Sequence, residues 1–287
     1  MDRLGTPARL DLSEACVVEQ PDPGALLQVA QEVVSKAVEH VLSHPPTHVR
    51  EKSDRDVVTD IDLAVEHLVR GLLSQHTADI GFLGEETGAT GNRTTYWVLD
   101  PIDGTTNFSH GMPINAIALG LVHREQPILG VVALPFLDSR YWAVHGGGAY
   151  RDDVRLSVSG ATDLSTSLIA LGDYGSGPRT AVGDLISAAL DRELTPRVQG
   201  VRRLGSTAVE LAWVAEGSID ASITLGNPTW DTAAGVVIAL EAGAIVVDAD
   251  GSPYSTRSRC AVATTPALRD VIVPLLELAR DTRYWPG

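Results

Sequence analysis

Residues 97–108 read Trp97-Val98-Leu99-Asp100-Pro101-Ile102-Asp103-Gly104-Thr105-Thr106-Asn107-Phe108, and this stretch decides how the chain is interpreted. Its first three residues are apolar and predict a buried strand. Two aspartates spaced three residues apart follow, with a proline that stiffens the turn between them. The next four or five residues predict a short helix whose first N–H groups would face an anion. Two carboxylates joined to an anion-binding turn predict a phosphate site, and an ordinary surface loop would seldom combine them.

Other carboxylates stand at comparable places along the chain. Glu85 and Glu86 follow the apolar run 80–83, and Asp231 follows Trp230, so both groups are expected where strands end. Carboxylates that converge there would repel one another unless cations lay between them. Ligands made of oxygen alone favour Mg²⁺ or Mn²⁺ over zinc, and two such ions form a clamp for phosphoryl displacement. Taken singly, Glu85 and Glu86 also fit a surface turn, and Asp231 also fits a helix N-cap.

Two helices are predicted in the first 75 residues. Apolar residues recur at helical spacing from residue 26 to residue 41, with Asp22 and Pro23 at the start and Pro45-Pro46 beyond the end. A second run covers residues 61–72, and Thr59 with Asp62 resembles a capping pair at its start. Asp56 is expected beside that start as well. Strands are expected at residues 114–122, 128–134 and 141–144, and the glycine triplet 146–148 is expected to be a turn.

The pattern changes near residues 152–165 and then alternates between helices and strands, which favours an α/β fold. Helices are expected at 181–190, 206–216, 231–242 and after Pro266, with strands at 219–224 and 244–247. Three segments follow from this pattern. Residues 1–22 are predicted to be a flexible N-terminal arm, residues 23–155 an α+β half that carries most metal ligands, and residues 156–287 an α/β half that completes the metal and substrate site.

Composition narrows the class of protein. The chain has 287 residues, 44% of them apolar, and a net charge of −15, which argues against a nucleic-acid partner. No apolar stretch approaches the roughly 20 residues that span a bilayer, and residues 1–14 do not resemble a secretory signal. We therefore expect no membrane association and a cytoplasmic location. Cys16 and Cys260 are far apart and predict neither a disulfide framework nor a zinc site.

At these residues the chain resembles the inositol monophosphatase-like family of Mg²⁺-dependent phosphatases. Residues 97–108 match the first signature of that family throughout, and residues 230–235 with 241–244 match its second signature. Gly84-Glu85-Glu86 and the segment with Asp56, Thr59 and Asp62 stand in the expected order. The resemblance spans residues 25–265. It implies a layered α/β/α/β/α sandwich, which is usually a homodimer.

The resemblance also implies the metal ligands, which are four carboxylates and one backbone carbonyl: Glu85, Asp100, Ile102, Asp103 and Asp231. The first Mg²⁺ would use Glu85, Asp100 and the carbonyl of Ile102, and the second would use Asp100, Asp103 and Asp231. A third, weaker ion would be held through Glu85, and Mn²⁺ is a substitute. Thr105 and Glu85 would orient the attacking water, and Asp62 would support the threonine hydroxyl. No covalent intermediate is expected.

The substrate is implied less fully than the reaction. Phosphate contacts are expected from Gly104, Thr105 and Thr106. Contacts to substrate hydroxyls are expected from Gly205, Ser206 and Thr207, although these residues also fit a helix cap. Relatives that act on inositol phosphates often carry an acidic residue seven positions before Asp231, where this chain has Thr224. The expected substrate is a small phosphorylated polyol such as myo-inositol 1-phosphate. Histidinol phosphate, fructose 1,6-bisphosphate and 3′-phosphoadenosine 5′-phosphate stay open, and residues 173–179 with Thr224 should decide among them.

The carboxylate pattern also bears on three other classes of protein. A haloacid-dehalogenase-type phosphatase needs a D-x-D spacing, whereas Asp100 and Asp103 are spaced D-x-x-D. The aspartates at 54, 56, 60 and 62 lack the glycine and the final glutamate of a calcium-binding EF-hand loop. A non-catalytic metal- or phosphate-binding relative would have lost ligands that are all present here. Lys52 and Asp56 fit either a loop that closes over the site or a solvated pair.

Overall fold

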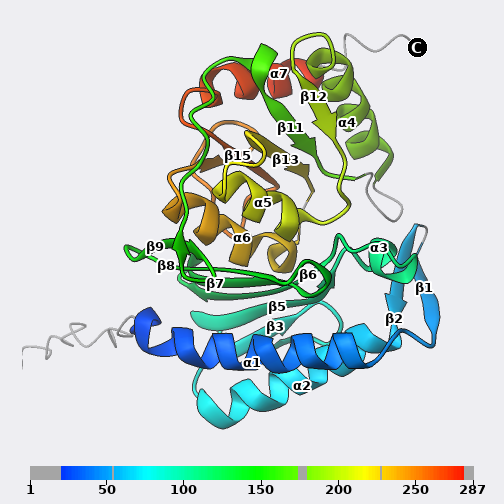
Figure 1. Ribbon diagram of the computed structural model, residues 1–287, viewed down its shortest axis with the longest axis vertical. Coiled ribbons are helices and arrows are strands. Elements are labelled where there is room, and N and C mark those ends of the chain that lie inside the picture. The colour runs from blue at the N-terminus through cyan, green and yellow to red at the C-terminus, as the bar shows by residue number, and fades with distance from the viewer. Residues whose placement is uncertain (1–20, 54, 174–179, 227, 281–287) are drawn as a thin grey trace, which may run out of the picture.

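Helices and sheets stack in five alternating layers, α/β/α/β/α, in the computed structural model (Figure 1). The structure describes residues 21–53, 55–173, 180–226 and 228–280. The predicted layered fold is confirmed. Residues 1–20 of the predicted arm, Cys16 and residues 174–179 lie outside the described residues. Among the described helices, none is long and apolar enough to span a bilayer.

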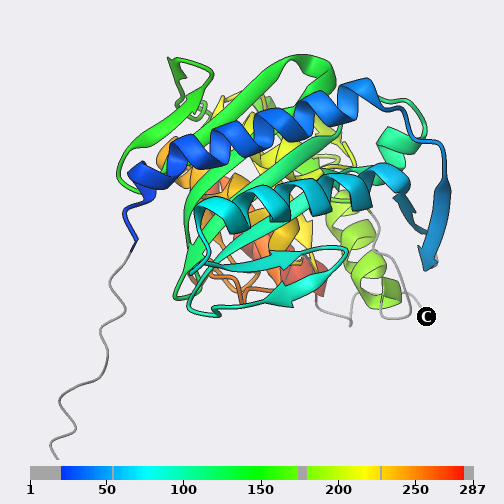
Figure 2. The ribbon, with the colours of Figure 1, turned by 90° about the horizontal axis from the view of Figure 1, so that it is seen from below.

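The first layer consists of α1 (Pro23–Ser43) and α2 (Asp60–His76), which lie side by side across one face of the first sheet (Figure 2). Both predicted starts are confirmed. The Asp22 carboxylate accepts a hydrogen bond from the backbone N–H of Gly24 at 2.9 Å, and Thr59 and Asp62 form a capping box at the start of α2. These caps satisfy N–H groups that a helix end otherwise leaves unpaired.

The second layer is an eight-stranded sheet in the order β10-β9-β8-β7-β6-β5-β3-β4, antiparallel except for the β3/β5 pair. Its strands are β3 (Gly81–Gly84), β4 (Gly88–Thr90), β5 (Thr95–Asp103), β6 (Ala116–His123), β7 (Gln126–Leu134), β8 (Ser139–Val144), β9 (Gly148–Arg151) and β10 (Val154–Arg155). The hairpin of β1 (Val49–Ser53) and β2 (Asp56–Thr59) forms a separate two-stranded sheet, which the sequence pattern did not reveal. The short helices are α3 (Thr105–Ser109), η1 (Pro135–Leu137) and η2 (Leu164–Thr166).

The middle layer consists of α5 (Thr207–Ala215) and α6 (Thr229–Glu241). Both helices are buried on nearly all sides because a sheet covers them above and below (Figure 1). The backbone of α6 comes very close to β7, since a Cβ atom added to Gly130 would lie 2.3 Å from the carbonyl oxygen of Ala234. Glycine in β7 therefore permits the close packing of the first sheet on the middle layer.

The fourth layer is a five-stranded sheet in the order β12-β11-β13-β15-β14. Its strands are β11 (Leu168–Leu171), β12 (Gly200–Arg202), β13 (Ala221–Leu225), β14 (Ile245–Val247) and β15 (Cys260–Thr264). The first three are parallel, and β15 runs antiparallel to both β13 and β14. The outer helices α4 (Thr180–Leu194) and α7 (Arg269–Arg280) form the fifth layer.

Two predictions about the carboxylates are wrong in detail. Asp100 and Asp103 do not follow a strand, because β5 continues to Asp103 with an irregular stretch of pairing to β6 between the two aspartates. Asp231 does not follow a strand end either. The strand β13 ends at Leu225, and Asp231 lies in the first turn of α6, whose N-cap is Pro228. The N-cap interpretation of Asp231 is therefore also wrong.

Candidate active site

A cavity of about 740 Å³ opens between the hairpin β1–β2, the carboxyl end of β3, α4, α5 and the start of α6. It brings together seven of the predicted site residues: Glu85, Asp103, Gly205, Ser206, Thr207, Thr224 and Asp231. Of the other predicted metal ligands, Asp100 and Ile102 are buried in β5. The residues come from both sheets and from the middle layer, so the cavity exists only where the two halves of the chain meet.

Asp103 joins these two halves directly. Its Oδ2 atom accepts a hydrogen bond from Ser206 Oγ and another from the backbone N–H of Ala208, each at 2.6 Å. Ser206 is also the N-cap of α5, since its Oγ accepts from the N–H of Val209 at 3.4 Å. The helix-cap interpretation of Ser206 is thus correct. Burial raises the pKa of Asp103 to about 6, although these hydrogen bonds lower it.

Glu85 lies beside Lys52, which β1 carries to the edge of the cavity. Lys52 Nζ is 2.8 Å from Glu85 Oε1 and 2.7 Å from Glu86 Oε1. Burial raises the pKa of Glu85 to about 7, Lys52 lowers it, and the neighbouring carboxylates of Glu86 and Asp62 raise it further. The sequence left open whether Lys52 approaches the site, and the structure places it there.

The backbone that carries Glu85 and Glu86 is held by a buried carboxylate that the sequence analysis missed. Glu66 of α2 accepts hydrogen bonds from the backbone N–H groups of Glu86 and Thr87, both at 2.8 Å. It is fully buried, and Gly84 leaves the space that it occupies. Glu66 lies on the apolar face of α2, and a charged residue at such a position was the signal that could have identified it.

Among the four carboxylates, Asp100 and Asp231 have the most strongly raised pKa values. Burial raises the pKa of Asp100 well above its ordinary value, and repulsion from Glu85, Asp103 and Asp231 adds to that effect. The pKa of Asp231 is raised in the same way, by burial first and then by Asp103 and Glu85. Glu85, Asp103 and Asp231 line the same cavity, and Asp100 lies in the strand that ends at Asp103. The structure therefore gathers the carboxylates that the sequence placed in separate segments.

Thr105 connects two of the predicted residues. Its Oγ1 lies 3.0 Å from Asp62 Oδ1 and 2.9 Å from the carbonyl oxygen of Ile102. Asp62 is fully buried, and its other oxygen accepts from the backbone N–H and the hydroxyl of Thr59. The capping box of α2 thus fixes the carboxylate that faces Thr105.

The turn before α3 has the backbone that the sequence predicts. Gly104 is the N-cap of α3 with φ of +88°, a conformation that favours glycine, and no side chain caps the helix there. Thr106 is exposed on the outside of α3 and does not line the cavity. Gly104 and Thr105 are half-buried, and they are not among the residues that line the cavity either.

The carboxylates suit hard divalent cations by their chemistry, since the group contains oxygen donors and neither imidazole nor thiol. Four carboxylates repel one another here, and bound cations would reduce this repulsion: Glu85, Asp100, Asp103 and Asp231. Within the described ranges, no three His, Cys, Asp or Glu side chains already enclose a cation position. Asp103 is hydrogen-bonded to Ser206, and Glu85 is paired with Lys52.

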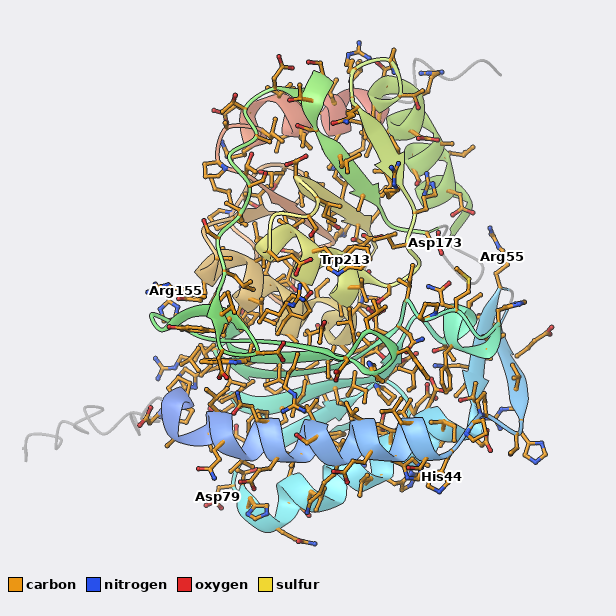
Figure 3. The ribbon with its side chains drawn as sticks, viewed as in Figure 1. His44, Arg55, Asp79, Arg155, Asp173 and Trp213 are labelled. Carbon is orange, nitrogen blue, oxygen red and sulfur yellow. The ribbon has the colours of Figure 1, made fainter. Side chains whose placement is uncertain are left out.

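Two further acidic residues line the cavity, of which Glu210 was not predicted. Glu210 of α5 is fully buried and accepts a hydrogen bond from Ser222 Oγ at 2.9 Å, and burial raises its pKa to about 8. Asp173 follows β11 and is exposed at the cavity (Figure 3). Residues 173–179 were expected as a group to help decide the substrate, and of these only Asp173 lies in the described part of the chain.

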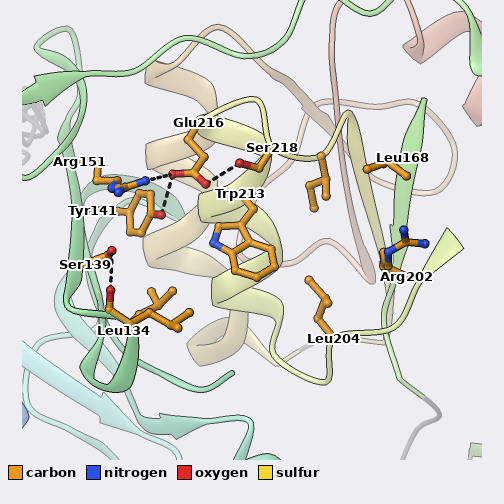
Figure 4. Close-up of a pocket in the computed structure, with 12 residues that line it drawn as sticks. Leu134, Ser139, Tyr141, Arg151, Leu168, Arg202, Leu204, Trp213, Glu216 and Ser218 are labelled. Atoms are coloured by element: carbon orange, nitrogen blue, oxygen red, sulfur yellow. Dashed lines mark hydrogen bonds and ion pairs between the residues drawn. The ribbon is translucent and has the colours of Figure 1, made fainter. Parts of the chain in front are cut away.

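A second cavity of about 410 Å³ lies away from the carboxylate site (Figure 4). Trp213 of α5 lies beside it, and apolar side chains of both sheets complete the lining. At one edge Glu216 accepts hydrogen bonds from Tyr141 at 2.8 Å and from Arg151 at 3.0 Å. None of the predicted site residues lines this cavity.

Comparisons with known proteins agree with this geometry. A model described as the inositol monophosphatase family matches residues 22–280. Inositol monophosphatase 2 of Solanum lycopersicum is 35% identical over 87% of this chain and 97% of its own length. The inositol-1-monophosphatase ImpA of Mycolicibacterium smegmatis is 34% identical over 93% and 97%. The solved structure of inositol monophosphatase from Anabaena superposes with a TM-score of 0.81 at 29% identity, covering 92% of this chain and all of that chain.

Proposed function

Because this chain belongs to the inositol monophosphatase family and is a phosphoric monoester hydrolase, we propose that it hydrolyses a small phosphorylated polyol such as myo-inositol 1-phosphate. The observation that supports this proposal is the convergence of Glu85, Asp103 and Asp231 in one cavity with the start of α5. The substrate is proposed from the names of the relatives. The cavity of about 740 Å³ is large enough for a sugar-sized phosphate ester.

The family is metal-dependent, and we propose Mg²⁺ as the ion, two to three per chain, with Mn²⁺ as a substitute. The ligands would be four carboxylates and one carbonyl oxygen: Glu85, Asp100, Ile102, Asp103 and Asp231. Such ions neutralise phosphate charge and acidify bound water when they are present. Asp100 feels the charges of Glu85, Asp103 and Asp231, and a carboxylate near all three would suit a ligand shared by two ions.

Thr105 and Glu85 would orient the attacking water. The single proton of the Thr105 hydroxyl points to Asp62 or to the carbonyl of Ile102, so Oγ1 keeps lone pairs that can accept a hydrogen bond from the attacking water. Glu85 lines the cavity, and its carboxylate can accept a hydrogen bond from that water. Both residues are held by α2, through Asp62 in one case and Glu66 in the other.

The phosphate and the departing alcohol would face different walls of the cavity. The N–H groups of Gly104 and Thr105 would donate to phosphate oxygens. Ser206 and Thr207, at the start of α5, would lie on the side of the departing alcohol, with Gly205 and Thr224 beside them. Thr106 was also expected to contact phosphate, and its exposed position gives this part of the proposal no support.

Phosphate release tests the proposal. The wild-type protein should release phosphate from myo-inositol 1-phosphate with Mg²⁺ and lose that activity when a chelator removes the ion. The panel should include histidinol phosphate, fructose 1,6-bisphosphate and 3′-phosphoadenosine 5′-phosphate, each with and without Mg²⁺. A higher kcat/KM for one of these three would refute the substrate, and the absence of Mg²⁺-dependent release from all four would refute the activity.

We also propose that the protein is a homodimer. Two exposed apolar residues of η1, Phe136 and Leu137, line neighbouring grooves, one with Leu42 and Met112 and the other with Trp213. Exposed apolar side chains that lie close together are typical of interfaces. Sedimentation should give twice the chain mass of 30.4 kDa, and Phe136→Ser should shift the equilibrium toward the monomer. A wild-type monomer at micromolar concentration would refute the proposed homodimer.

The cytoplasmic location stays a prediction.

A further inference from the structure

The turn that carries Glu85 has three consecutive backbone N–H groups bonded to other elements. The N–H of Glu85 donates to the carbonyl of Leu99 in β5 at 3.3 Å. The next two N–H groups, those of Glu86 and Thr87, both donate to the Glu66 carboxylate at 2.8 Å. A turn has no helix or strand ladder of its own to satisfy such groups. Leu99 and Glu66 therefore fix the backbone on the two sides of the Glu85 side chain.

The Glu66 carboxylate accepts a third hydrogen bond, from the hydroxyl of Thr87. That hydroxyl accepts in turn from Arg70 Nη1 at 3.0 Å, and Arg70 Nη2 donates to Thr90 at 3.2 Å. A carboxylate can accept all three bonds, whereas an amide has one acceptor oxygen and an –NH₂ group that would face a backbone N–H. Hydrogen bonds to an ionised acceptor are also the stronger ones. The position of Glu66 therefore requires a carboxylate and not only a polar side chain.

Close packing leaves the Glu66 carboxylate little room to move. Glu66 is fully buried, and a Cβ atom at position 84 would lie 2.5 Å from both of its carboxylate oxygens. Gly84 is the last residue of β3 and directly precedes Glu85. Glu66 is not among the residues that line the cavity, so it does not touch a substrate bound there. Any effect of Glu66 on the reaction must pass through the backbone of the turn.

Asp62 lies one helical turn before Glu66 on the same face of α2, and both side chains are fully buried. Thr105 Oγ1 donates to Asp62 Oδ1, with 3.0 Å between the two oxygens. Two carboxylates of one helix thus hold Thr105 in one case and the turn of Glu85 in the other. The two positions are separated by a rise of about 6 Å along the helix axis. A rigid helix therefore sets the placement of Glu85 relative to Thr105.

We propose that Glu66 is a positioning residue for the hydrolysis, and that it fixes the Glu85 carboxylate relative to the Thr105 hydroxyl through the N–H groups of Glu86 and Thr87. The inference rests on the proposed function, in which Glu85 and Thr105 orient the attacking water. Glu66 acts on a metal ligand and on the water, and not on the alcohol part of the substrate. The value of kcat and the affinity for Mg²⁺ should therefore depend on Glu66, whereas KM should depend on it little.

Glu66→Gln is the test variant, because it keeps the shape of the side chain and replaces one acceptor oxygen by a donor. At saturating Mg²⁺, kcat on myo-inositol 1-phosphate should fall about tenfold to a hundredfold, as is typical when a group that orients a metal ligand is lost. KM should stay within about threefold of the wild-type value. The Mg²⁺ concentration that gives half of the rise in thermal midpoint should increase by about tenfold. This second measurement does not depend on activity.

Leu276→Ala is the control for a loss of stability. Leu276 is a fully buried residue of α7 in the fifth layer. The substitution should lower the thermal midpoint, while kcat and the half-saturating Mg²⁺ concentration stay within about twofold of the wild type. A Glu66→Gln variant with a lower midpoint but with the kcat and Mg²⁺ response of the wild type would overturn the inference, since Glu66 would then be purely structural.

A second pair of variants decides the matter if Glu66→Gln does not fold. Thr87 is exposed, and Thr87→Val removes the hydroxyl that donates to Glu66. Its kcat should fall about twofold to fivefold, whereas Thr87→Ser keeps the hydroxyl and should stay within about twofold. Equal kcat and equal Mg²⁺ response in these two variants would overturn the inference.

Failure of the proposed function is recognised separately. If the wild type releases no phosphate from myo-inositol 1-phosphate, the proposed substrate fails, and the response of the thermal midpoint to Mg²⁺ still tests the role of Glu66. A wild-type midpoint that does not respond to Mg²⁺ would refute both the proposed ion and the inference.

Discussion

Asp103 and Ser206 are joined by a hydrogen bond of 2.6 Å that links the first sheet to the helix α5 of the middle layer. The same carboxylate oxygen also accepts from the backbone N–H of Ala208 at 2.6 Å. One proposed metal ligand thus also caps the helix that begins with the proposed substrate contacts. The carboxylate couples the position of the metal site to the position of the opposite wall.

Asp103→Asn should abolish Mg²⁺-dependent phosphate release while leaving the fold intact. An asparagine oxygen can still accept from Ser206, so the free energy of unfolding should change by no more than about 1 kcal/mol. The charge needed by a cation is lost, and activity should fall by about a thousandfold or more. Steady-state kinetics and urea denaturation measure the two effects. Substantial Mg²⁺-dependent activity in this variant would refute the role assigned to Asp103.

Thr105→Val should lower kcat by at least about a hundredfold, because it removes the hydroxyl that lies between Asp62 and the carbonyl of Ile102. Thr105→Ser is the matched control, since serine keeps that oxygen and should retain activity within about tenfold. The comparison is made by steady-state kinetics at saturating Mg²⁺. A loss in Thr105→Ser as large as that in Thr105→Val would contradict a role that rests on the hydroxyl alone.

Lys52→Met should make the protein respond to lower Mg²⁺ concentrations. Lys52 holds Glu85 Oε1 at 2.8 Å, so it competes with a cation for that carboxylate. An ion pair of this exposure contributes up to about 1 kcal/mol, and the apparent Mg²⁺ affinity should rise by about fivefold. The thermal midpoint measured against Mg²⁺ concentration gives this affinity. An unchanged or weaker affinity would contradict the competition.

Glu210→Gln should change how stability depends on pH. Burial raises the pKa of Glu210 from 4.5 to about 8, so the native protein keeps a proton that the unfolded chain releases. The stability contributed by this protonated carboxyl is full below pH 4.5 and is lost as the pH rises toward 8, by roughly 1.4 kcal/mol per unit. Glutamine does not titrate, so the free energy of unfolding of the variant should rise relative to that of the wild type as the pH increases across this range. Urea denaturation at pH 5, 6, 7 and 8 gives the free energy of unfolding of both proteins, and the two curves against pH should converge or cross. Parallel curves would contradict the raised pKa of Glu210.

Gly130→Ala should destabilise the fold by about 1–3 kcal/mol, because its Cβ atom would lie 2.3 Å from the carbonyl oxygen of Ala234 in α6. Gly71→Ala is the matched control. Position 71 lies in the exposed part of α2 with no atom within 4 Å of the added Cβ, and alanine should stabilise it by about 0.5–1 kcal/mol. Opposite signs in urea denaturation are expected. A stable Gly130→Ala variant would mean that β7 and α6 pack less closely.

Much of the fold could be predicted from local patterns. The capping box of Thr59 and Asp62 fixes the start of α2 because its atoms are three residues apart, and the apolar spacing of residues 26–41 is enough to predict α1. Strands such as β15 (Cys260–Thr264) were missed because a short apolar run without turn residues has no decisive period. Strand β1 is exposed along its length and β2 is buried only at Val58 and Thr59, so neither strand alternates and the pattern gave no signal.

The sequence by itself determined the family and the identity of the proposed metal ligands, because residues 97–108 place two carboxylates and a helix start within one short segment. Only the tertiary structure decided what surrounds them. The ion pair of Lys52 with Glu85, the support of Glu66 and the pairing of Gly172 with Thr224 join residues more than 15 positions apart. Such contacts depend on how the five layers stack, and no local spacing encodes them.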